Sequence, residues 1–419
     1  MHILYLHQYF CPPEGSGNNR SYEFAKEWAK THTVTILTTK AYFPKDYFNS
    51  HRFIEHVCHL QIDNINVEVL NIDYAHTMNY AQRIHAFMQY VILSIRYLKR
   101  HHNFDVIYAS STPLSVGWIA YQAYKRYKIP YFFEVVDLWP DVPIEMGIIR
   151  NPFFKKWLWK WEKKIYTYAD GIITLSSGMT KKILAKKIPE SKIFTVPNGT
   201  NTNFFKPCPI EKKQGYKSAL GFNSTDFIAI YSGTVGRANG VKYLIEIANL
   251  AQKDNLKAVK FVIVGSGNRI KEVKTLVQKY ELNNIYFFDA VPKTQILPYL
   301  YAADVGIITF EKYPILNTNS ANKFFDYLAV GLPICANYQG WQAEVAHNKA
   351  GLFAPSDDIS TFYQNFKKLF FDSSMRSEFA RNAVELSRMY DRKHLSAQVL
   401  SLLERQYNAK KEQQVSSAL

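Results

Sequence analysis

Short apolar runs alternate with amphipathic stretches along the first half of the chain. The apolar runs have the length of β-strands and read HILYLHQYF, TVTILTT, DVIYASS, PYFFEVV and GIITLSS. The stretches between them, such as SYEFAKEWAK, place apolar residues at helical spacing. Strands that alternate with helices form βαβ units, in which the strands lie parallel in one sheet. This half is therefore predicted to be a Rossmann-like α/β domain.

The second half repeats this alternation without repeating the sequence. Its apolar runs read DFIAIYSGT, KFVIVGSG, NIYFFDAV, DVGIITF and GLPICAN. A polar, lysine-rich stretch at residues 211–217 separates the halves and is interpreted as the linker. A last helix is predicted for about residues 387–406, with a frayed tail after it. The predicted domains are residues 1–199, joined by a C-terminal helix at about 388–419, and residues 200–387.

Length and composition agree with two folded domains. The chain has 419 residues, of which 47% are hydrophobic and 21% charged, so two cores of ordinary size are expected. No apolar run is long enough to span a membrane. The four cysteines, at positions 11, 58, 208 and 335, have no metal-binding or disulfide spacing. A cytoplasmic protein is predicted.

The net charge of +16 calls for an anionic partner, which could be nucleic acid, anionic lipid or a phosphorylated substrate. Residues 150–168, RNPFFKKWLWKWEKKIYTY, interleave lysines with aromatic residues at helical spacing. One interpretation is an interfacial helix that places Lys155, Trp157, Trp159 and Lys160 on an anionic membrane. The alternative is a helix packed on the core with a solvated lysine face.

Glycine-rich turns follow several predicted strands. Gly15 and Gly17 follow the first strand, and Gly265 follows KFVIV. Gly233 lies in the turn SGTVGRANG, which also contains Arg237. Such turns let backbone amides approach a phosphate beside a helix N-terminus, although each alone could be an ordinary βα loop. The spacing GxGxxG is missing, which argues against an NAD-dependent oxidoreductase.

The segment LNTNSANKFFDYLAVGLPI is the densest group of candidate binding residues. Small polar residues precede a short predicted helix that carries Asn322, Lys323 and Asp326 near its start. Because Lys323 and Asp326 are three residues apart, they share one face of the helix. A cation beside a carboxylate suits a phosphate and a ribose, and the alternative is a surface ion pair.

In the first half, FEVVDLWPD places carboxylates at the end of a strand, where sites of α/β proteins lie. Glu134 or Asp137 could assist an acceptor hydroxyl, or these acidic residues could cap the next helix. Neither a DxD cluster nor a His/Asp set with metal-binding spacing occurs, so neither a metal nor another cofactor is expected.

At these residues the chain resembles glycosyltransferase family 4, whose members are retaining enzymes with the GT-B fold. It resembles in particular bacterial transferases for O-antigen and capsule assembly that add N-acetyl-L-fucosamine. The similar segments span nearly the whole chain: HQYFCPPEGSGNNR, EVVDLWPDVPIEMG, SSGM, VPNGTNTNFF, YSGTVGRANG, VGSGN, NTNSANKFFDYLAVGLPI and GWQAE. The resemblance implies two Rossmann-like domains facing across a cleft, with the C-terminal helix crossing back to the first domain.

The resemblance also implies a donor, a UDP-sugar, held mainly by the second domain. Its base would lie near Val291, its ribose would meet Asp326, and its diphosphate would meet Arg237, Lys323 and backbone amides between Gly15 and Gly17.

Two departures from the family pattern fall in this donor site. The usual arginine and lysine of the phosphate loop become Thr234 and Asn239, with Arg237 as a displaced substitute. The usual glutamates eight residues apart become Thr318 and Asp326.

The resulting hypothesis is a metal-independent, retaining sugar transfer to a polyprenyl-diphosphate-linked saccharide, with Asp137 orienting the acceptor. It places the protein peripherally at the inner face of the plasma membrane. A GT-B nucleotide-sugar epimerase remains an alternative, because it would share the fold and the donor. A basic nucleic-acid-binding protein is disfavoured, because no nucleic-acid motif accompanies the lysines.

Overall fold

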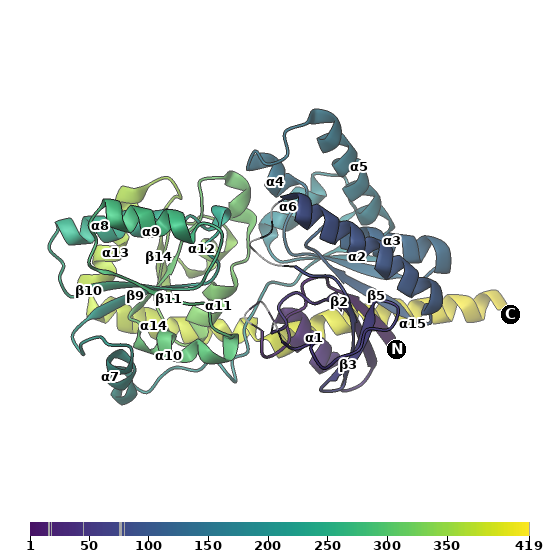
Figure 1. The fold of residues 1–419 in the computed structure, drawn as a ribbon, viewed down its shortest axis with the longest axis horizontal. Coiled ribbons are helices and arrows are strands. Elements are labelled where there is room, and N and C mark those ends of the chain that lie inside the picture. Colours follow the sequence, from purple (N-terminus) through teal and green to yellow (C-terminus); the bar gives the residue numbers. More distant parts are fainter. Residues whose placement is uncertain (16, 18, 45, 75–77, 79, 419) are drawn as a thin grey trace. The chain divides into compact units, whose positions relative to one another are not determined.

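The chain folds into two compact units, each with its own sheet (Figure 1). The computed structural model describes residues 1–15, 17, 19–44, 46–74, 78 and 80–418. Unit 1 comprises Met1–Pro197 and Arg392–Leu419, and unit 2 comprises Asn198–Asp391. The chain therefore leaves unit 1 after Pro197 and returns to it at Arg392.

Unit 1 is built on a sheet of eight strands among the described residues. They are β1 (His2–Leu6), β2 (Thr33–Thr39), β3 (Val57–Ile62), β4 (Ile65–Leu70), β5 (Val106–Ser110), β6 (Tyr131–Val135), β7 (Gly171–Thr174) and β8 (Ile193–Thr195). Their order is β3-β4-β2-β1-β5-β6-β7-β8, and all neighbours are parallel except β3 and β4, which form an antiparallel pair at one edge. The connection reverses direction across the sheet between β1 and β5, which makes the carboxyl ends of these strands the expected place for a ligand.

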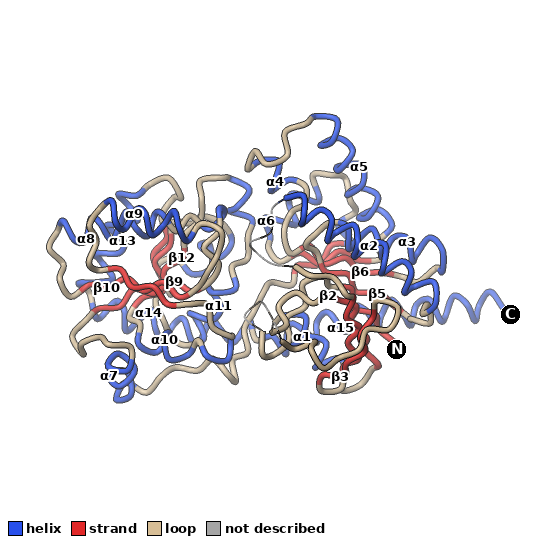
Figure 2. Tube along the Cα trace, viewed as in Figure 1, coloured by secondary structure: helices blue, strands red, loops and turns tan. Residues whose placement is uncertain are grey.

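Helices cover this sheet, as Figure 2 shows in blue and red. Those of unit 1 are α1 (Arg20–Trp28), α2 (Tyr80–Arg100), α3 (Ser115–Tyr127), α4 (Asp141–Glu145), α5 (Pro152–Tyr168), α6 (Ser177–Leu184), the 3-10 turn η1 (Glu190–Lys192) and α15 (Arg392–Ala418). The C-terminal helix α15 packs on α1, where the indole of Trp28 donates to the carbonyl of Ser396 at 3.1 Å. Helix α15 also continues beyond the predicted end at residue 406.

Unit 2 contains six strands in the described residues, all parallel. They are β9 (Phe227–Ser232), β10 (Val259–Val264), β11 (Ile285–Phe288), β12 (Val305–Ile308), β13 (Ile334–Ala336) and β14 (Gly351–Phe353). The order β11-β10-β9-β12-β13-β14 is that of a doubly wound dinucleotide-fold sheet, with its switch point between β9 and β12. Most of these strands are buried on both faces, which explains why they appear as continuous apolar runs in the sequence.

The helices of unit 2 connect these parallel strands. They are α7 (Ile210–Ala219), α8 (Lys242–Lys253), α9 (Ile270–Lys279), α10 (Leu297–Ala302), α11 (Asn322–Ala329), α12 (Trp341–Ala346), α13 (Ile359–Phe371) and α14 (Ser373–Ser387), with the 3-10 turns η2 (Arg237–Asn239), η3 (Lys293–Gln295), η4 (Pro314–Thr318) and η5 (Arg388–Tyr390). Both units are thus Rossmann-like α/β domains, as predicted.

The lysine-rich stretch interpreted as the linker is instead helix α7 of unit 2, so that prediction is wrong. Lys213 and Lys217 of this helix pair with opposite oxygens of Asp304 at 2.8 and 2.9 Å. These ion pairs fix α7 against the start of β12, and the lysines that suggested a solvated linker hold the helix in place.

Candidate functional site

The glycine turns that follow β9 and β10 lie against each other at the carboxyl edge of the unit 2 sheet. The amide of Val235 donates to the carbonyl of Ser266 at 2.9 Å. A Cβ atom on Gly265 would lie 2.0 Å from the carbonyl oxygen of Gly233, and one on Gly267 would lie 2.3 Å from that of Val235. Glycine is therefore required at both positions because two backbones meet there.

Lys323 brings its ammonium group to the exposed turn after β9. A Cβ atom on Gly233 would lie 3.4 Å from the Lys323 Nζ, and that Nζ stands 3.7 Å from the centre of the Tyr231 ring. Desolvation by burial lowers the pKa of Lys323 to about 7. Among the residues that the structure describes, no carboxylate pairs with this lysine. An ammonium held in this way has a strong preference for an anion.

Asp326 lies one turn further along α11 and is held in place by two neighbours. Its Oδ1 is 3.1 Å from the Lys293 Nζ and accepts a hydrogen bond from the Thr200 hydroxyl at 2.5 Å. Both charged side chains are 14% exposed. Asn322 is the first residue of the same helix, so it stands next to Lys323 at the helix N-terminus. Asn322, Lys323 and Asp326 therefore lie on one helix, their joint role in donor binding stays a prediction, and Lys293 is a charged neighbour that the sequence did not reveal.

Arg237 belongs to a neighbouring cavity of about 220 Å³, whose lining does not include Lys323. Its guanidinium donates to the Tyr313 hydroxyl at 3.2 Å. Thr234 and Arg237 are both exposed, and the backbone carbonyl of Asn239 accepts a hydrogen bond from Thr309 at 2.7 Å. The turn is thus tied to β12, and its Arg237 has an exposed cationic end at the carboxyl edge.

Val291, predicted near the base, is half-buried in the loop between β11 and η3. It lies two positions before Lys293, the partner of Asp326. The loop after β11 therefore supplies both an apolar surface and a cation.

In unit 1, Glu134 is buried inside a saturated polar network. Its Oε1 is 2.9 Å from the Arg20 Nε and accepts from the Tyr108 hydroxyl at 2.8 Å, while Oε2 accepts from the Ser110 hydroxyl at 2.6 Å. Burial alone would raise the pKa of Glu134, but Arg20 and these hydroxyl donors outweigh it and leave the pKa lowered. With both oxygens engaged, the carboxylate has a structural role in this geometry, in contrast to the acceptor role predicted for it.

Asp137 stands at the carboxyl end of β6 with its carboxylate less engaged. Its Oδ2 accepts from the Thr112 hydroxyl at 3.2 Å, and burial raises the pKa of this carboxyl group. A carboxylate of raised pKa at a strand end suits an interaction with a hydroxyl group.

The loop after β1 uses its own atoms to satisfy the amides of Gly15 and Gly17. The amide of Gly15 donates to the carbonyl of Pro12 at 2.9 Å, and that of Gly17 donates to the Cys11 Sγ at 3.1 Å. Ser16 and Asn18 lie outside the described residues. The predicted contact of these amides with a diphosphate stays a prediction. It would require both amides to give up their hydrogen bonds to Pro12 and Cys11.

Gln8 is a further polar group at the end of β1 that the sequence did not single out. Its side chain is fully buried, and neither amide atom has a hydrogen-bond partner among the described residues. An unsatisfied buried amide is costly unless a polar group occupies the adjoining space. Nothing in its local sequence, HQYF, distinguishes it from a strand residue.

No group of three or more His, Cys, Asp and Glu side chains in the described part of the chain could hold a metal ion. None of the described helices is both long and apolar enough to cross a bilayer.

Helix α5 divides its predicted membrane residues between two flanks. Trp157 is 53% exposed and stacks on Trp161 at 5.1 Å between ring centroids. The indole of Trp159 instead donates to Asp141 of α4 at 2.8 Å. Lys160 is exposed, whereas Lys155 is half-buried. Trp157 and Lys160 therefore share an exposed surface, and Trp159 attaches α5 to the segment that follows Asp137.

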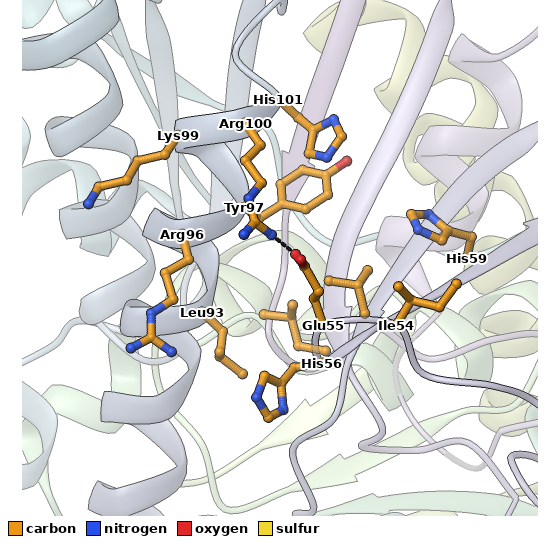
Figure 3. A pocket seen from close by; sticks show the side chains of 12 residues that line it. Ile54, Glu55, His56, His59, Leu93, Arg96, Tyr97, Lys99, Arg100 and His101 are labelled. Carbon is orange, nitrogen blue, oxygen red and sulfur yellow. Dashed lines mark ion pairs between the residues drawn. The ribbon is translucent and has the colours of Figure 1, made fainter.

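A hollow of about 640 Å³ in unit 1 lies between the end of α2 and the start of β3 (Figure 3). Arg100 of α2 is directed at Glu55 and pairs with it. Both side chains are more than 60% exposed, so this pair lacks the burial seen at Lys323. Arg96 and Lys99 add to the positive charge of α2.

Comparisons with known proteins agree with this two-unit architecture. Residues 15–199 match the family model described as glycosyl transferase 4-like domain, and residues 212–386 match that of glycosyl transferases group 1.

Two curated relatives are similar over parts of their length. They are alpha-galactosylglucosyldiacylglycerol synthase of Streptococcus pneumoniae, 25% identical over 165 residues, and the putative colanic acid biosynthesis glycosyl transferase WcaI of Escherichia coli, 24% identical over 162 residues. Each match covers 39% of this chain, and 44% and 39% of the respective relatives. The aligned region thus spans about two-fifths of these proteins.

Solved structures share the fold over nearly the whole chain. Sucrose-phosphate synthase from Thermosynechococcus elongatus has a TM-score of 0.76 at 16% identity, with 98% of this chain and 100% of that chain covered. Anabaena HepE in complex with UDP-glucose has a TM-score of 0.73 at 16% identity, with 97% and 100% covered. WaaG, a glycosyltransferase involved in lipopolysaccharide biosynthesis, has a TM-score of 0.70 at 13% identity, with 96% and 99% covered.

The two family matches adjoin each other along the chain and correspond to the two Rossmann-like units, and the similar solved structures have the GT-B fold. This chain therefore belongs to the glycosyltransferases that combine a glycosyl transferase 4-like domain with a glycosyl transferases group 1 domain.

Proposed function

We propose that this protein transfers a sugar from a UDP-sugar to a lipid-linked saccharide, with retention of configuration and without a metal ion. The observation that carries the proposal is the Lys323 ammonium, which is held at the carboxyl edge of the unit 2 sheet without a carboxylate partner among the described residues. The family assignment and the structural likeness to a protein that binds UDP-glucose support a nucleotide-sugar donor.

The donor contacts follow from the side chains at this edge. Lys323 and Arg237 would neutralise the diphosphate, and the N-terminus of α11 would add positive potential. Asp326, held by Lys293, would accept hydrogen bonds from the ribose, and the base would lie at Val291. A diphosphate beside Lys323 would raise the pKa of its ammonium group and keep it charged.

In the proposed reaction the bond between the anomeric carbon and the β-phosphate oxygen breaks, and the acceptor oxygen bonds to the same face of that carbon. The acceptor proton passes to a phosphate oxygen of the leaving UDP. Asp137 would orient the acceptor hydroxyl. The main contribution to rate would come from fixed positive groups at the developing negative charge.

Replacement of Lys323 tests this proposal. The variant Lys323→Met keeps much of the volume and removes the charge, so turnover should fall by roughly 10²–10³-fold, the effect of losing one preorganised electrostatic donor. The measurement is sugar transfer from a panel of UDP-sugars to a polyprenyl-diphosphate-linked saccharide, followed by mass spectrometry.

Tyr313→Phe provides a control at the same edge, because it removes only a hydroxyl that contacts Arg237. Near-normal transfer by Lys323→Met would remove this lysine from the mechanism. Formation of an isomer from the donor alone, without acceptor, would indicate the epimerase alternative.

The acceptor is proposed to be lipid-linked, with an amino sugar such as N-acetyl-L-fucosamine among the donors to be tested and polysaccharide assembly as the setting. The exposed positive charge of α5 supports a peripheral position at the inner face of the plasma membrane. Its lysines at 155, 156, 160, 163 and 164 have no ion-pair partner among the described residues, and its Glu162 is buried against Lys186.

Vesicle binding tests this membrane position. Each lysine near an anionic surface contributes about 1 kcal/mol. The double variant Lys155→Ala/Lys156→Ala should therefore bind vesicles containing phosphatidylglycerol roughly tenfold or more weakly at low salt. Equal binding of wild type and variant, or no binding by either, would contradict the membrane position.

A further inference from the structure

Helix α5 lines a groove in unit 1 that has a strongly aromatic wall. The groove has a volume of about 760 Å³ and lies between α2, α3 and α5. Met88 and Val91 line one side, and Trp118, Trp157, Trp161 and Tyr168 line the other. This volume is in the range of sites that hold a small ligand.

The aromatic wall is continuous, because neighbouring rings contact one another. Trp157 stacks on Trp161 at 5.1 Å, and Trp161 contacts Trp118 of α3 at 5.4 Å. Tyr121 of α3 joins Trp118 to Tyr168, with ring centroids 5.2 Å apart in both pairs. Met88 is 54% exposed and Tyr168 45% exposed, so the groove is open to solvent. A large apolar surface left open in this way marks a site for an apolar partner.

A row of cations borders the wall. Lys160, Lys163 and Lys164 line the groove, and none of them has an ion-pair partner among the described residues. The indoles of Trp118, Trp157 and Trp161 also donate to no acceptor in that part of the chain. Unpaired ammonium groups beside free N–H donors suit a phosphate. The groove therefore fits a molecule that joins a long apolar part to an anionic phosphate.

The topology places one end of the groove at the edge where Asp137 lies. Helix α3 follows β5 directly, so its first turn, with Trp118, is at the carboxyl edge of the sheet. Thr112, just before this helix, donates to Asp137. Tyr168 immediately precedes the short link to β7 and therefore lies toward the opposite, amino edge. A chain in the groove would run away from Asp137 along α3 and α5.

We infer that this groove binds the hydrocarbon chain of the acceptor lipid, with its phosphate on the lysine row and its sugar toward Asp137. This inference rests on the proposed function, since it assigns the lipid part of the proposed acceptor. The groove would thus hold the hydrocarbon chain of a single acceptor molecule, and it would not be the surface that contacts the bilayer. The bilayer would instead contact exposed side chains outside the groove, such as Phe153, which is 82% exposed.

The test is binding of farnesyl monophosphate, followed by tryptophan fluorescence below its micelle-forming concentration and without vesicles. Wild type should bind it at least about a hundredfold more tightly than isopentenyl monophosphate, because the longer chain buries much more apolar surface in the groove. The variant Met88→Glu puts a carboxylate into the groove at an exposed position and should weaken binding roughly tenfold or more. Phe153→Ala is the matched control and should bind as wild type does.

A second arm measures transfer to the lipid-linked acceptor. Farnesyl monophosphate should inhibit competitively against the acceptor and not against the UDP-sugar, and Met88→Glu should raise the KM for the acceptor with little change in that for the donor. Equal binding by wild type and Met88→Glu, or binding without inhibition, would overturn the groove assignment. Equal loss of binding in Met88→Glu and Phe153→Ala would also overturn it, because Phe153 lies outside the groove. Absence of transfer from any UDP-sugar, with farnesyl binding intact, would count against the proposed function alone.

Discussion

Two desolvated cations of this protein, the buried Arg20 in unit 1 and the half-buried Lys323 in unit 2, stand in opposite electrostatic situations. Arg20 is 3% exposed, pairs with Glu134 and donates to the carbonyls of Pro197 and Val196. Lys323 faces an aromatic ring and the turn at Gly233, with no carboxylate partner among the described residues. The first cation is satisfied within the fold, and the second is not.

This difference separates a structural charge from a binding charge. Burial by itself lowers the pKa of Arg20, but the Glu134 carboxylate together with the Tyr108 and Tyr5 hydroxyls outweighs it, and the pKa is raised. At Lys323 the desolvation has no such counterweight and lowers the pKa to about 7. A cation–π contact is worth about 0.5–2 kcal/mol and does not replace a counter-ion. The charge of Arg20 is thus neutralised by Glu134 within the fold. The charge of Lys323 has no such counter-ion among the described residues, so this lysine can bind an external anion.

The largest expected effect comes from breaking the satisfied pair. Glu134→Ala would leave the Arg20 charge buried without its partner, so the free energy of unfolding should fall by roughly 3–5 kcal/mol. Urea denaturation measures this change. Lys323→Met is the matched control, because it deletes a desolvated charge that has no carboxylate partner among the described residues, and its stability should equal or exceed that of wild type. A large loss in Lys323→Met with little change in Glu134→Ala would reverse the comparison.

A smaller effect distinguishes packing from binding among the glycines of unit 2. Gly265 has a φ of +153°, and a Cβ atom there would meet the Gly233 carbonyl at 2.0 Å. Gly265→Ala should therefore destabilise the protein by roughly 1–3 kcal/mol. Gly215→Ala, in α7, meets nothing within 4 Å and should instead stabilise by roughly 0.5–1 kcal/mol. Thermal unfolding gives both values, and an unchanged Gly265→Ala would show that the two turns do not need their close approach.

Much of the fold could be predicted because the buried parallel strands are continuous apolar runs. TVTILTT is strand β2, and the segment with Lys323 and Asp326 is helix α11. The antiparallel pair β3 and β4 was not predicted, because VCHLQI mixes polar and apolar residues as an edge strand does. The lysines of α7 suggested a linker because their partner, Asp304, is distant in the sequence.

The candidate site could be predicted where its residues are neighbours along the chain. Lys323 and Asp326 fall on one helical face, which periodicity alone reveals. The partner of Asp326 is Lys293, and the partner of Glu134 is Arg20, each from a different element. Such pairs arise only when strands are ordered in the sheet, so the saturated Glu134 could not be distinguished from the more open Asp137 before the fold was known.

The proton balance of UDP binding tests most directly the claim that Lys323 is the unsatisfied cation of the donor site. Without UDP, Lys323 has a pKa of about 7 and is mostly neutral at pH 8. A bound diphosphate would raise that pKa. Calorimetry in buffers of different ionisation enthalpy should therefore show uptake of nearly one proton at pH 8. Any protons that UDP itself gains or loses on binding are the same for wild type and Lys323→Met, so they cancel when the two proton uptakes are subtracted. The account predicts that the difference between the two proteins is close to one proton at pH 8 and disappears at pH 6, where the lysine is already charged. The same proton uptake by both proteins at pH 8 would contradict it.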